Sequence, residues 1–369
     1  MGLVKTDSFY KCNDVNFRKI TADSGSPNYL TSGGTYGYRV QCSLQGSTGW
    51  HNVYYQTQSV YPTVFFGARI TNGWVMSTGN FKPFLQVASN VTNTPGLSFC
   101  VGDSGQILVY YALNSGTSSV TSTFLAASEG GKFNPGTTKC IQVKCVASVS
   151  SGSFEVKIDD EVLTWASGSN TSVQTALSTN LYNMFIAGGK YGRNFGGSNT
   201  TASSFSGLNG FYYDSVAIWD TTGVSFNDFQ VPFSIKPDDP QGNGANSGWL
   251  GSDGNSTDNY ALLNTATTTN NLTATAANTT DNYTHASGLT SENGIIAVVP
   301  TFKASKSDAG SCQISPLIYD GSSNYAMSDV SPQTTEGFVQ SFNYVDPKTG
   351  VQFNYADYNG YQIGMNLSV

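Results

Sequence analysis

Charged side chains are what this sequence has least of. Among 369 residues there are 17 Lys and Arg, 24 Asp and Glu, and 2 His, so charged residues make up 11% of the chain. That is less than half of the roughly 25% typical of soluble domains. No basic cluster is available to neutralise phosphates, and a net charge of −7 opposes a polyanion. Nucleic-acid binding is therefore excluded.

Long apolar runs and metal-binding patterns are also missing. No stretch approaches the roughly 20 apolar residues that span a bilayer, so we expect no membrane insertion. The first residues lack the apolar segment of a secretory signal, so we expect none. Six cysteines occur without close CxxC spacing, and only two histidines accompany them. We therefore expect buried free thiols, no metal site and no cofactor.

Aromatic and turn-forming residues are abundant instead. Aromatic residues make up 13% of the chain, which supplies enough apolar area to exclude disorder. Short runs rich in Val, Ile, Phe and Tyr are bounded by Gly, Asn, Ser or Asp, which is typical of antiparallel strands. These runs lie at 37–44, 63–70, 73–77, 97–101, 107–112, 140–149, 153–158, 184–187 and 211–219. They predict an all-β fold with a β-sandwich of jelly-roll type.

The amino-acid composition of the sequence changes after Asp220. Three prolines fall within 221–246, a stretch rich in Thr and Asn covers 265–280, and strand-like runs resume at 294. We place a domain boundary near 222, which gives a first domain at 1–222 and a second at 223–369. The second is expected to be a smaller antiparallel β-sandwich.

One motif suggests a serine protease. Residues 100–105 read CVGDSG, similar to the nucleophile loop of chymotrypsin-like proteases, and His51 could serve as the base. Only 53 residues separate His51 from Ser104, too few for the double barrel of that family. The Gly-Asp-Ser-Gly sequence is equally suited to a hairpin turn, which we favour.

A second motif suggests a glycoside hydrolase. Glu155, Asp159 and Glu161 are spaced in twos, so a continuous strand would place the carboxylates on one face. The Asp-Asp-Glu sequence is better explained as a turn between strands 154–158 and 162–165. On that interpretation the carboxylates point into solvent.

Aromatic clusters form the third candidate site. Trp50, His51, Tyr54, Tyr55 and Trp74 lie beside predicted loops, where exposed rings could stack on sugars. The alternative is that these rings fill the core or an interface between subunits, which is the commoner use of aromatics in sandwiches.

Two loops are candidates for contact with a partner or a glycan. They cover 45–60 and 190–205, and the second contains Tyr191 and Arg193. Binding residues tend to lie on loops that a rigid scaffold carries.

Two regions resemble bacteriophage proteins. The run GFYYDSVAIWD at 210–220, with Tyr213 and Asp214, resembles the last strand of concanavalin A-like, laminin-G-type jelly-rolls of phage virion proteins. Nearly all of 224–369 resembles a second module of tailed-phage structural proteins. Its landmarks, in chain order, are Trp249, Tyr260, Asp308, Gly310, Asp346, Gly350 and Gly364.

The resemblance implies a bacteriophage virion component of the tail, collar spike, fibre or head-decoration type. We accordingly expect a non-enzymatic structural protein, located in the virion, that assembles as a homo-oligomer with other virion proteins. A trimer is expected because fibre-like virion parts have that arrangement. Host-surface polysaccharide is an expected additional partner.

Two alternatives remain open. One is a carbohydrate-binding adhesin or lectin that acts through the N-terminal jelly-roll. The other is a polysaccharide depolymerase that uses Glu155 and Glu161.

Overall fold

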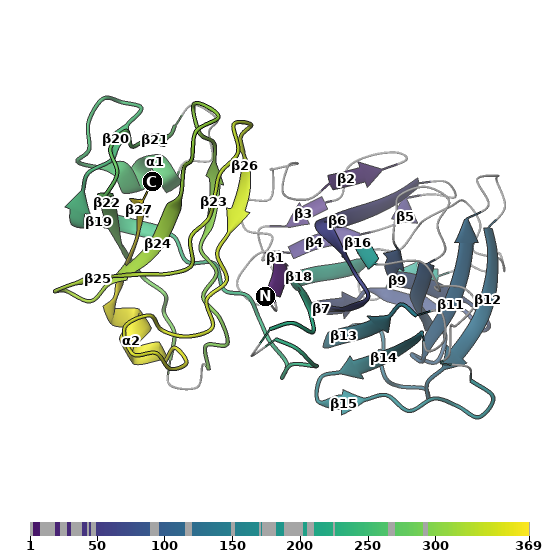
Figure 1. Ribbon diagram of the computed structural model, residues 1–369. Helices are drawn as coiled ribbons and strands as arrows, with labels where there is room; N and C mark the ends of the chain where they lie inside the picture. The colour runs from purple at the N-terminus through teal and green to yellow at the C-terminus, as the bar shows by residue number, and fades with distance from the viewer. Residues whose placement is uncertain are drawn as a thin grey trace. The chain divides into compact units, whose positions relative to one another are not determined.

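The computed structural model describes most of the chain. The described residues are 3–7, 19–22, 28–30, 39–42, 44–45, 49–88, 96–114, 120–148, 152–169, 171, 182–187, 202–204, 210–223, 226–264, 270–290 and 294–368. The chain divides into two compact units, Met1–Lys236 and Pro237–Val369, and both consist mainly of antiparallel strands (Figure 1). The predicted all-β class is confirmed.

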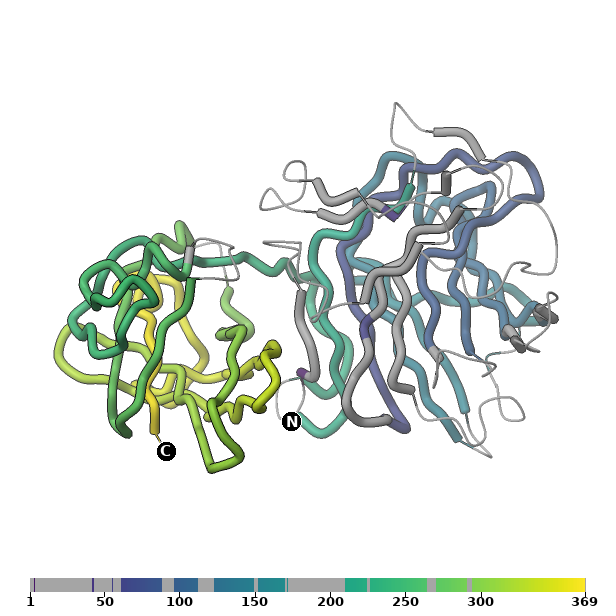
Figure 2. The backbone as a smooth tube through the Cα atoms, turned by 90° about the horizontal axis from the view of Figure 1, so that it is seen from above, coloured from purple at the N-terminus to yellow at the C-terminus, as the bar shows by residue number. Residues whose placement is uncertain are grey.

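The first unit is a sandwich of two large sheets (Figures 1 and 2). The first sheet has the spatial order β15 (Glu161–Val162), β14 (Ser153–Ile158), β13 (Thr138–Val146), β7 (Thr63–Asn72), β18 (Phe211–Asp220), β4 (Arg39–Cys42), β3 (Asn28–Leu30), and β1 (Leu3–Asp7) also pairs with β18. The second sheet has the order β12 (Val120–Ala127), β11 (Ile107–Asn114), β10 (Gly96–Gly102), β9 (Phe81–Ala88), β16 (Tyr182–Ala187), β6 (Gly49–Tyr61), β2 (Lys19–Ala22), and β5 (Leu44–Gln45) pairs with β6. A separate pair joins β8 (Trp74–Met76) to β17 (Ala202–Ser204).

One hydrophobic core lies between these two sheets. Alternate residues of β10, Leu97, Phe99 and Val101, are fully buried in it, as are Val143 and Ile218 from the first sheet. Because successive side chains of a strand point to opposite faces, each sheet also has an outer face turned away from this core. The two outer faces are the surfaces on which a binding site could be built.

The outer face of the first sheet is covered by the chain itself. The indole of Trp219 stacks on the ring of Phe65 at 5.3 Å between centroids and with an interplanar angle of 2°. Phe226 and Phe233, from the segment 226–235, meet the Trp219 indole edge-on at 5.9 Å and 6.2 Å. We call the segment 226–235 the strap.

Side chains of the first sheet hydrogen-bond to the backbone of the strap. The Gln142 side chain donates from Nε2 to the Gln230 carbonyl oxygen and accepts the Gln230 N–H at Oε1, both at 2.8 Å. Lys157 Nζ donates to the same carbonyl oxygen at 2.7 Å. The strap therefore packs with the first unit, which extends to Lys236, although the sequence pattern placed a boundary near 222.

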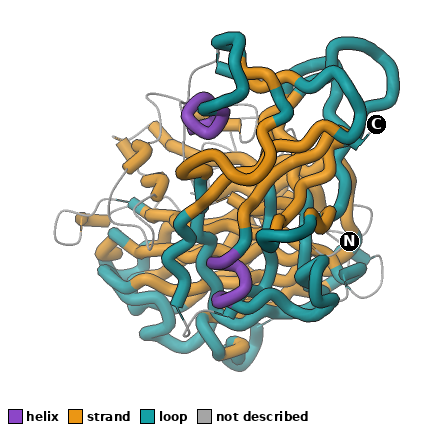
Figure 3. Tube along the Cα trace, turned by 90° about the vertical axis from the view of Figure 1, so that its left-hand side faces the viewer, coloured by secondary structure: helices purple, strands orange, loops and turns teal. Residues whose placement is uncertain are grey.

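The second unit is built around one five-stranded sheet. Its spatial order is β19 (Pro240–Ser247), β22 (Thr279–His285), β27 (Gln362–Leu367), β24 (Ile314–Tyr319) and β25 (Asn324–Ala326). Two short pairs accompany it, β20 (Leu250–Gly251) with β21 (Leu272–Thr273), and β23 (Thr301–Ala304) with β26 (Gly337–Gln340). Two six-residue helices, α1 (Asn259–Asn264) and α2 (Tyr355–Gly360), lie toward opposite ends of this unit (Figures 1 and 3).

Several residues that carry the phage resemblance hold the second unit together. The Trp249 indole is 7% exposed and donates from Nε1 to the Thr279 carbonyl oxygen at 3.0 Å. Tyr260 packs against the same hydrophobic cluster. Asp346 is 1% exposed and accepts a hydrogen bond from the Tyr361 hydroxyl at 2.7 Å. These side chains stabilise the fold of this unit.

The remaining landmarks shape turns or allow close packing. Asp308 Oδ1 accepts the Gly310 N–H at 2.7 Å. Gly350 has φ of 72°, a left-handed conformation that favours glycine. Gly364 lies in β27, where a Cβ atom would be only 2.2 Å from the Asp281 carbonyl oxygen.

In the first unit, the jelly-roll landmarks are also structural. Tyr213 is fully buried, and its hydroxyl donates to the Phe84 carbonyl oxygen on the opposite sheet. Asp214 accepts the Ser215 hydroxyl at 2.6 Å and lies 3.9 Å from Arg69 Nε.

Candidate functional site

The aromatic residues predicted for glycan contact occupy different environments. Tyr55 and Trp74 are 0% and 7% exposed and belong to the sandwich core, so their side chains are not presented to a ligand. Trp50, His51 and Tyr54 lie in the long strand β6, where a loop was expected over 45–60, and their side chains lie outside the described part of the structure. Tyr191 and Arg193 lie outside the described residues.

The motif around Ser104 forms a hairpin turn, as the turn interpretation predicted. It joins β10 to β11, with Gly105 at φ of 71°. Ser104 donates its hydroxyl to Gln106 Oε1 and its backbone N–H to the same oxygen at 2.9 Å. These contacts are those of a turn and not of a nucleophile beside a base.

The carboxylates of the proposed hydrolase motif are in ion pairs on a hairpin. Asp159, with φ of 51°, lies in the turn between β14 and β15 and pairs with Lys139 at 2.8 Å. Glu155 lies 3.0 Å from Lys144 Nζ, and Glu161 lies 2.6 Å from Lys132 Nζ. The turn interpretation is confirmed, and each carboxylate has its own lysine partner.

The outer face of the second sheet carries a row of side chains that no sequence motif indicated. Backbone pairing places Gln86, Ser98, Tyr110 and Phe124 opposite one another on the neighbouring strands β9, β10, β11 and β12. Their neighbours on β9, β10 and β11 belong to the sandwich core, as does Leu125 on β12. Cross-strand partners share one face, so these four side chains form a continuous row across the sheet.

Aromatic rings dominate one end of this row. The Tyr110 ring stacks on Phe81 at 4.7 Å with an interplanar angle of 19°, and meets Phe124 edge-on at 5.6 Å. Phe124 is 51% exposed, a large fraction for a ring on a sandwich sheet. We call Phe81, Tyr110 and Phe124 the aromatic patch. Rings in this arrangement offer an apolar platform on which a sugar ring can stack.

Polar groups form the other end of the row. Gln86 and Ser98 are 4% and 1% exposed, and Gln86 Nε2 donates to the Ser98 hydroxyl at 2.7 Å. The Gln86 Oε1 atom is buried and has no hydrogen-bond partner among the described residues. A buried acceptor without a donor is costly, so this atom would be stabilised by a ligand hydroxyl.

The patch has no fixed charge, and its tyrosine stays neutral. Burial, together with the nearby Cys100 thiol, raises the pKa of Tyr110 to about 12. Cys100 is fully buried, and burial raises the pKa of its thiol well above the usual range. A protonated phenol and a neutral amide suit an uncharged, hydroxyl-rich ligand.

A buried lysine lies at the edge of the same strand β9. Lys82 is 3% exposed, its Nζ lies 5.1 Å from the centroid of the Trp74 ring, and burial lowers its pKa to about 8. The Trp74 ring thus contacts the Lys82 ammonium group and the hydrophobic core. Because both contacts lie inside the protein, Trp74 stabilises the fold and is not available to stack on a sugar.

The described ranges contain neither a metal-binding cluster nor a membrane-spanning helix. No group of three or more His, Cys, Asp and Glu side chains there is placed to hold a metal ion. Among those residues no helix is long and apolar enough to cross a membrane. Cys100, Cys140, Cys145 and Cys312 are free thiols, and the first three are buried as expected, as is Cys42.

Comparison with known proteins gives matches in structure only. No family model matches the chain, and no curated protein matches its sequence. Alginate lyase vAL-1 from Chlorella virus matches 59% of this chain and 99% of its own, with 8% identity and a TM-score of 0.38. A glycoside hydrolase family 16 endo-glucanase from Bacteroides ovatus matches 58% of this chain and 100% of its own, with 11% identity and a TM-score of 0.39.

A third match comes from a bacteriophage. The CBM2 module of the evolved Dit protein of Lactobacillus casei BL23 phage J-1 matches 59% of this chain and 95% of its own, with 9% identity and a TM-score of 0.34. These matches contradict the expectation that the chain is not an enzyme, because two of the three similar structures are an alginate lyase and an endo-glucanase. The fold therefore does not exclude catalysis.

The aromatic patch had a weak signal in the sequence. Strand β11 reads ILVYYALN, and its run of apolar residues hides which of Tyr110 and Tyr111 faces outward. Only the register with β10 and β12 shows that Tyr110 is in the outer row and Tyr111 in the core.

Proposed function

We propose that the chain is a structural component of a bacteriophage virion that contacts carbohydrate through the outer face of the second sheet. The observation that carries the carbohydrate contact is the row formed by the aromatic patch and the buried Gln86 amide. Stacking surface and a hydrogen-bond acceptor lie side by side on rigid strands, which is the combination that sugar recognition needs.

The contrast between the two outer faces supports this choice. The strap already covers the first sheet, where Gln142 and Trp219 are occupied by contacts with the chain itself. On the second sheet, Phe124 remains half exposed beside Tyr110.

The virion role rests on the second unit. The ordered landmarks that resemble a tailed-phage module occupy structural positions, such as the buried Asp346 and the tightly packed Gly364. We propose assembly as a homo-oligomer, with a trimer as the first model, together with other virion proteins. Peptide mass spectrometry of gradient-purified particles tests this role, and absence of the chain from mature particles would refute it. Solution mass tests the assembly, because a monomer would match 39.2 kDa.

We expect the double variant Tyr110→Ala/Phe124→Ala to lose binding to carbohydrate. Removing two stacked rings from a sugar platform should weaken affinity by about ten- to a hundredfold, since each aromatic contact contributes about 1 kcal/mol or more. The measurement is a glycan array followed by titration of the best polysaccharide, with the oligomer intact. The same reactions are analysed for released fragments, which detects cleavage.

Matched variants separate recognition from folding. Gln86→Leu keeps the side-chain volume and removes the acceptor, so it should weaken binding by about tenfold. Val162→Ala alters a residue that is 49% exposed on β15 of the other sheet, and should bind normally. Unchanged binding by the correctly folded double variant would disprove the proposed surface.

A further inference from the structure

Strand β12 forms one end of the second sheet. It pairs with β11 on one side, and among the described strands none pairs with its other side (Figure 1). The edge of a sheet presents unpaired backbone N–H and C=O groups, which can pair with a further strand. The residues of an edge strand decide whether such pairing is blocked.

The sequence of β12 contains none of the residues that block an edge. It reads VTSTFLAA, with no charged residue, no proline and no glycine over eight residues. Thr123 is exposed, and Phe124 is 51% exposed. Edge strands are usually protected by lysine, by proline or by short length, and β-branched and aromatic residues favour pairing.

The other strands at the ends of the large sheets are short or charged. Strand β15 has two residues, and its Glu161 lies 2.6 Å from Lys132 Nζ. Strand β2 begins at Lys19, and β3 and β25 have three residues each. Charge or length therefore limits pairing at these edges.

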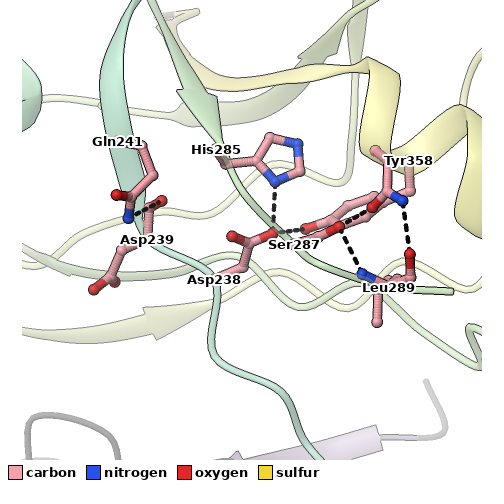
Figure 4. A network of polar contacts seen from close by, with 8 residues as sticks. Asp238, Asp239, Gln241, His285, Ser287, Leu289 and Tyr358 are labelled. Atoms are coloured by element: carbon pink, nitrogen blue, oxygen red, sulfur yellow. Dashed lines mark hydrogen bonds and ion pairs between the residues drawn. The ribbon is translucent and has the colours of Figure 1, made fainter.

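Strand β19, at one end of the second unit's sheet, is protected by proline and carboxylates. It begins at Pro240, which has no N–H to donate, and its register with β22 shifts twice. Asp238 and Asp239 precede it directly, and the Asp238 carboxylate lies 2.5 Å from His285 Nδ1 (Figure 4). Among these six edges, β12 differs in being long and uncharged.

The regular part of the β12 edge is the stretch 120–124. Its register with β11 is unbroken from Val120 to Phe124 and shifts beyond Phe124. Ala127 is already engaged, because its N–H donates to Ser169 Oγ at 3.4 Å and its carbonyl oxygen accepts the Ala166 N–H at 2.8 Å. The shift and these contacts end the edge that is available for pairing.

This stretch is nearly palindromic, which suits pairing with a second copy of itself. In an antiparallel pair related by a two-fold axis at Ser122, Ser122 lies opposite its own copy. Thr121 then lies opposite Thr123, and Val120 lies opposite Phe124. Pairs of hydroxyl residues and pairs of an aromatic with a β-branched residue stabilise antiparallel strands.

Charge also favours a second copy. A two-fold pairing brings each side chain near its own copy, so a charged strand would repel itself. The chain has a net charge of −7, yet β12 has no charge.

We propose that two copies of the chain join through β12, antiparallel and centred on Ser122, so that their second sheets become one continuous sheet. The axis is perpendicular to the sheet, which places the aromatic patches of both copies on the same face. The pairing uses the backbone edge and is independent of the proposed carbohydrate contact. The proposed trimer needs a separate three-fold contact, and both contacts together would give six copies.

Sedimentation equilibrium of the purified full-length chain over a range of concentrations tests the pairing. We expect an even number of copies, with a mass of twice 39.2 kDa from the edge alone. Thr123→Lys adds like charges to the paired strands, so it should raise the concentration at which the pair dissociates by about tenfold. Val162→Lys is the control on the edge strand β15, where the residue is 49% exposed, and should leave the mass unchanged.

Ser122→Cys tests the register. Opposite residues of an antiparallel pair have Cβ atoms about 4.5–5.5 Å apart, so the two introduced thiols should form a disulfide on mild oxidation. Electrophoresis without reductant should then show a band at twice the chain mass. Val162→Cys and the wild type are the controls and should stay mainly as single chains.

Three results would overturn the proposal. A monomeric wild type would leave the edge to a strand of another protein. A trimer that Thr123→Lys does not change would keep the three-fold contact and refute this one. Cross-linking of Ser122→Cys no faster than that of Val162→Cys would refute the register. Thermal unfolding shows that each variant is folded, and Thr123→Lys keeps the aromatic patch, so loss of carbohydrate binding is a separate result.

Discussion

Replacing Gly364 with alanine is expected to prevent stable folding of the second unit. Gly364 lies in β27, the central strand between β22 and β24, and a Cβ atom there would be 2.2 Å from the Asp281 carbonyl oxygen and 2.7 Å from Asn282 Nδ2. One of these contacts is backbone of a paired strand, which cannot move without breaking the sheet. Overpacking typically costs about 1–3 kcal/mol, and the cost exceeds this range where rigid backbone blocks the new atom.

The measurement for Gly364→Ala is thermal unfolding of the full chain. The transition of the second unit should disappear or shift down by many degrees, while that of the first unit is kept. Gly360→Ala is the matched control, because its Cβ would have no atom within 4 Å. A Gly364→Ala protein with the unfolding curve of the control would contradict the close approach of β27 and β22.

Replacing Trp219 with alanine is expected to release the strap and destabilise the first unit. The indole is fully buried, stacks on Phe65 and meets Phe226 and Phe233 edge-on. Its Nε1 also donates to the Asp228 carbonyl oxygen at 3.0 Å. Truncation of a buried tryptophan costs about 3–5 kcal/mol, so denaturant unfolding of this unit should move to lower concentration.

Limited proteolysis measures the strap directly. In Trp219→Ala, cleavage within 226–235 should become fast, because the rings that cover the sheet have lost their partner. Val231→Ala is the control in the same segment, since this residue is 61% exposed and should leave stability unchanged. A strap that stays protected in Trp219→Ala would show that Gln142 and Lys157 hold it without the aromatic cluster.

Neither variant touches the surfaces on which the function is proposed. Trp219 lies in β18 of the first sheet and Gly364 in β27 of the second unit, and neither belongs to the row that contains Phe124 and Gln86. Loss of carbohydrate binding in the double variant Tyr110→Ala/Phe124→Ala can thus be distinguished from a loss of folding.

The motifs with turn chemistry were predictable from their residues. Gly-Asp-Ser-Gly at 102–105 and Asp159-Asp160 each form a hairpin turn, because glycine or a short polar side chain allows the left-handed backbone that a tight turn requires. The same local signals favoured a turn over a protease loop at 102–105 and over a strand carrying paired carboxylates at 159–161.

Properties that depend on distant contacts were not predictable. The extended strand β6 replaced an expected loop at 45–60, since its pairing with β2, β5 and β16 overrides a local sequence rich in Gly, Ser and Thr. Tyr55 and Trp74 are buried because their side chains lie on the strand faces that pack against the core. The two short helices were also not expected, because six residues give too little periodicity to detect.

The sequence by itself determined the all-β class and the scarcity of charge, since short apolar runs, turn residues and composition are local properties. Only the tertiary structure decided which aromatics are exposed and where the strap lies. These depend on register and on packing between segments far apart in the chain, and a one-residue change of register would reverse every face. Many charged side chains among the described residues are partners in ion pairs or turns, while neutral rings and an amide form the candidate binding surface.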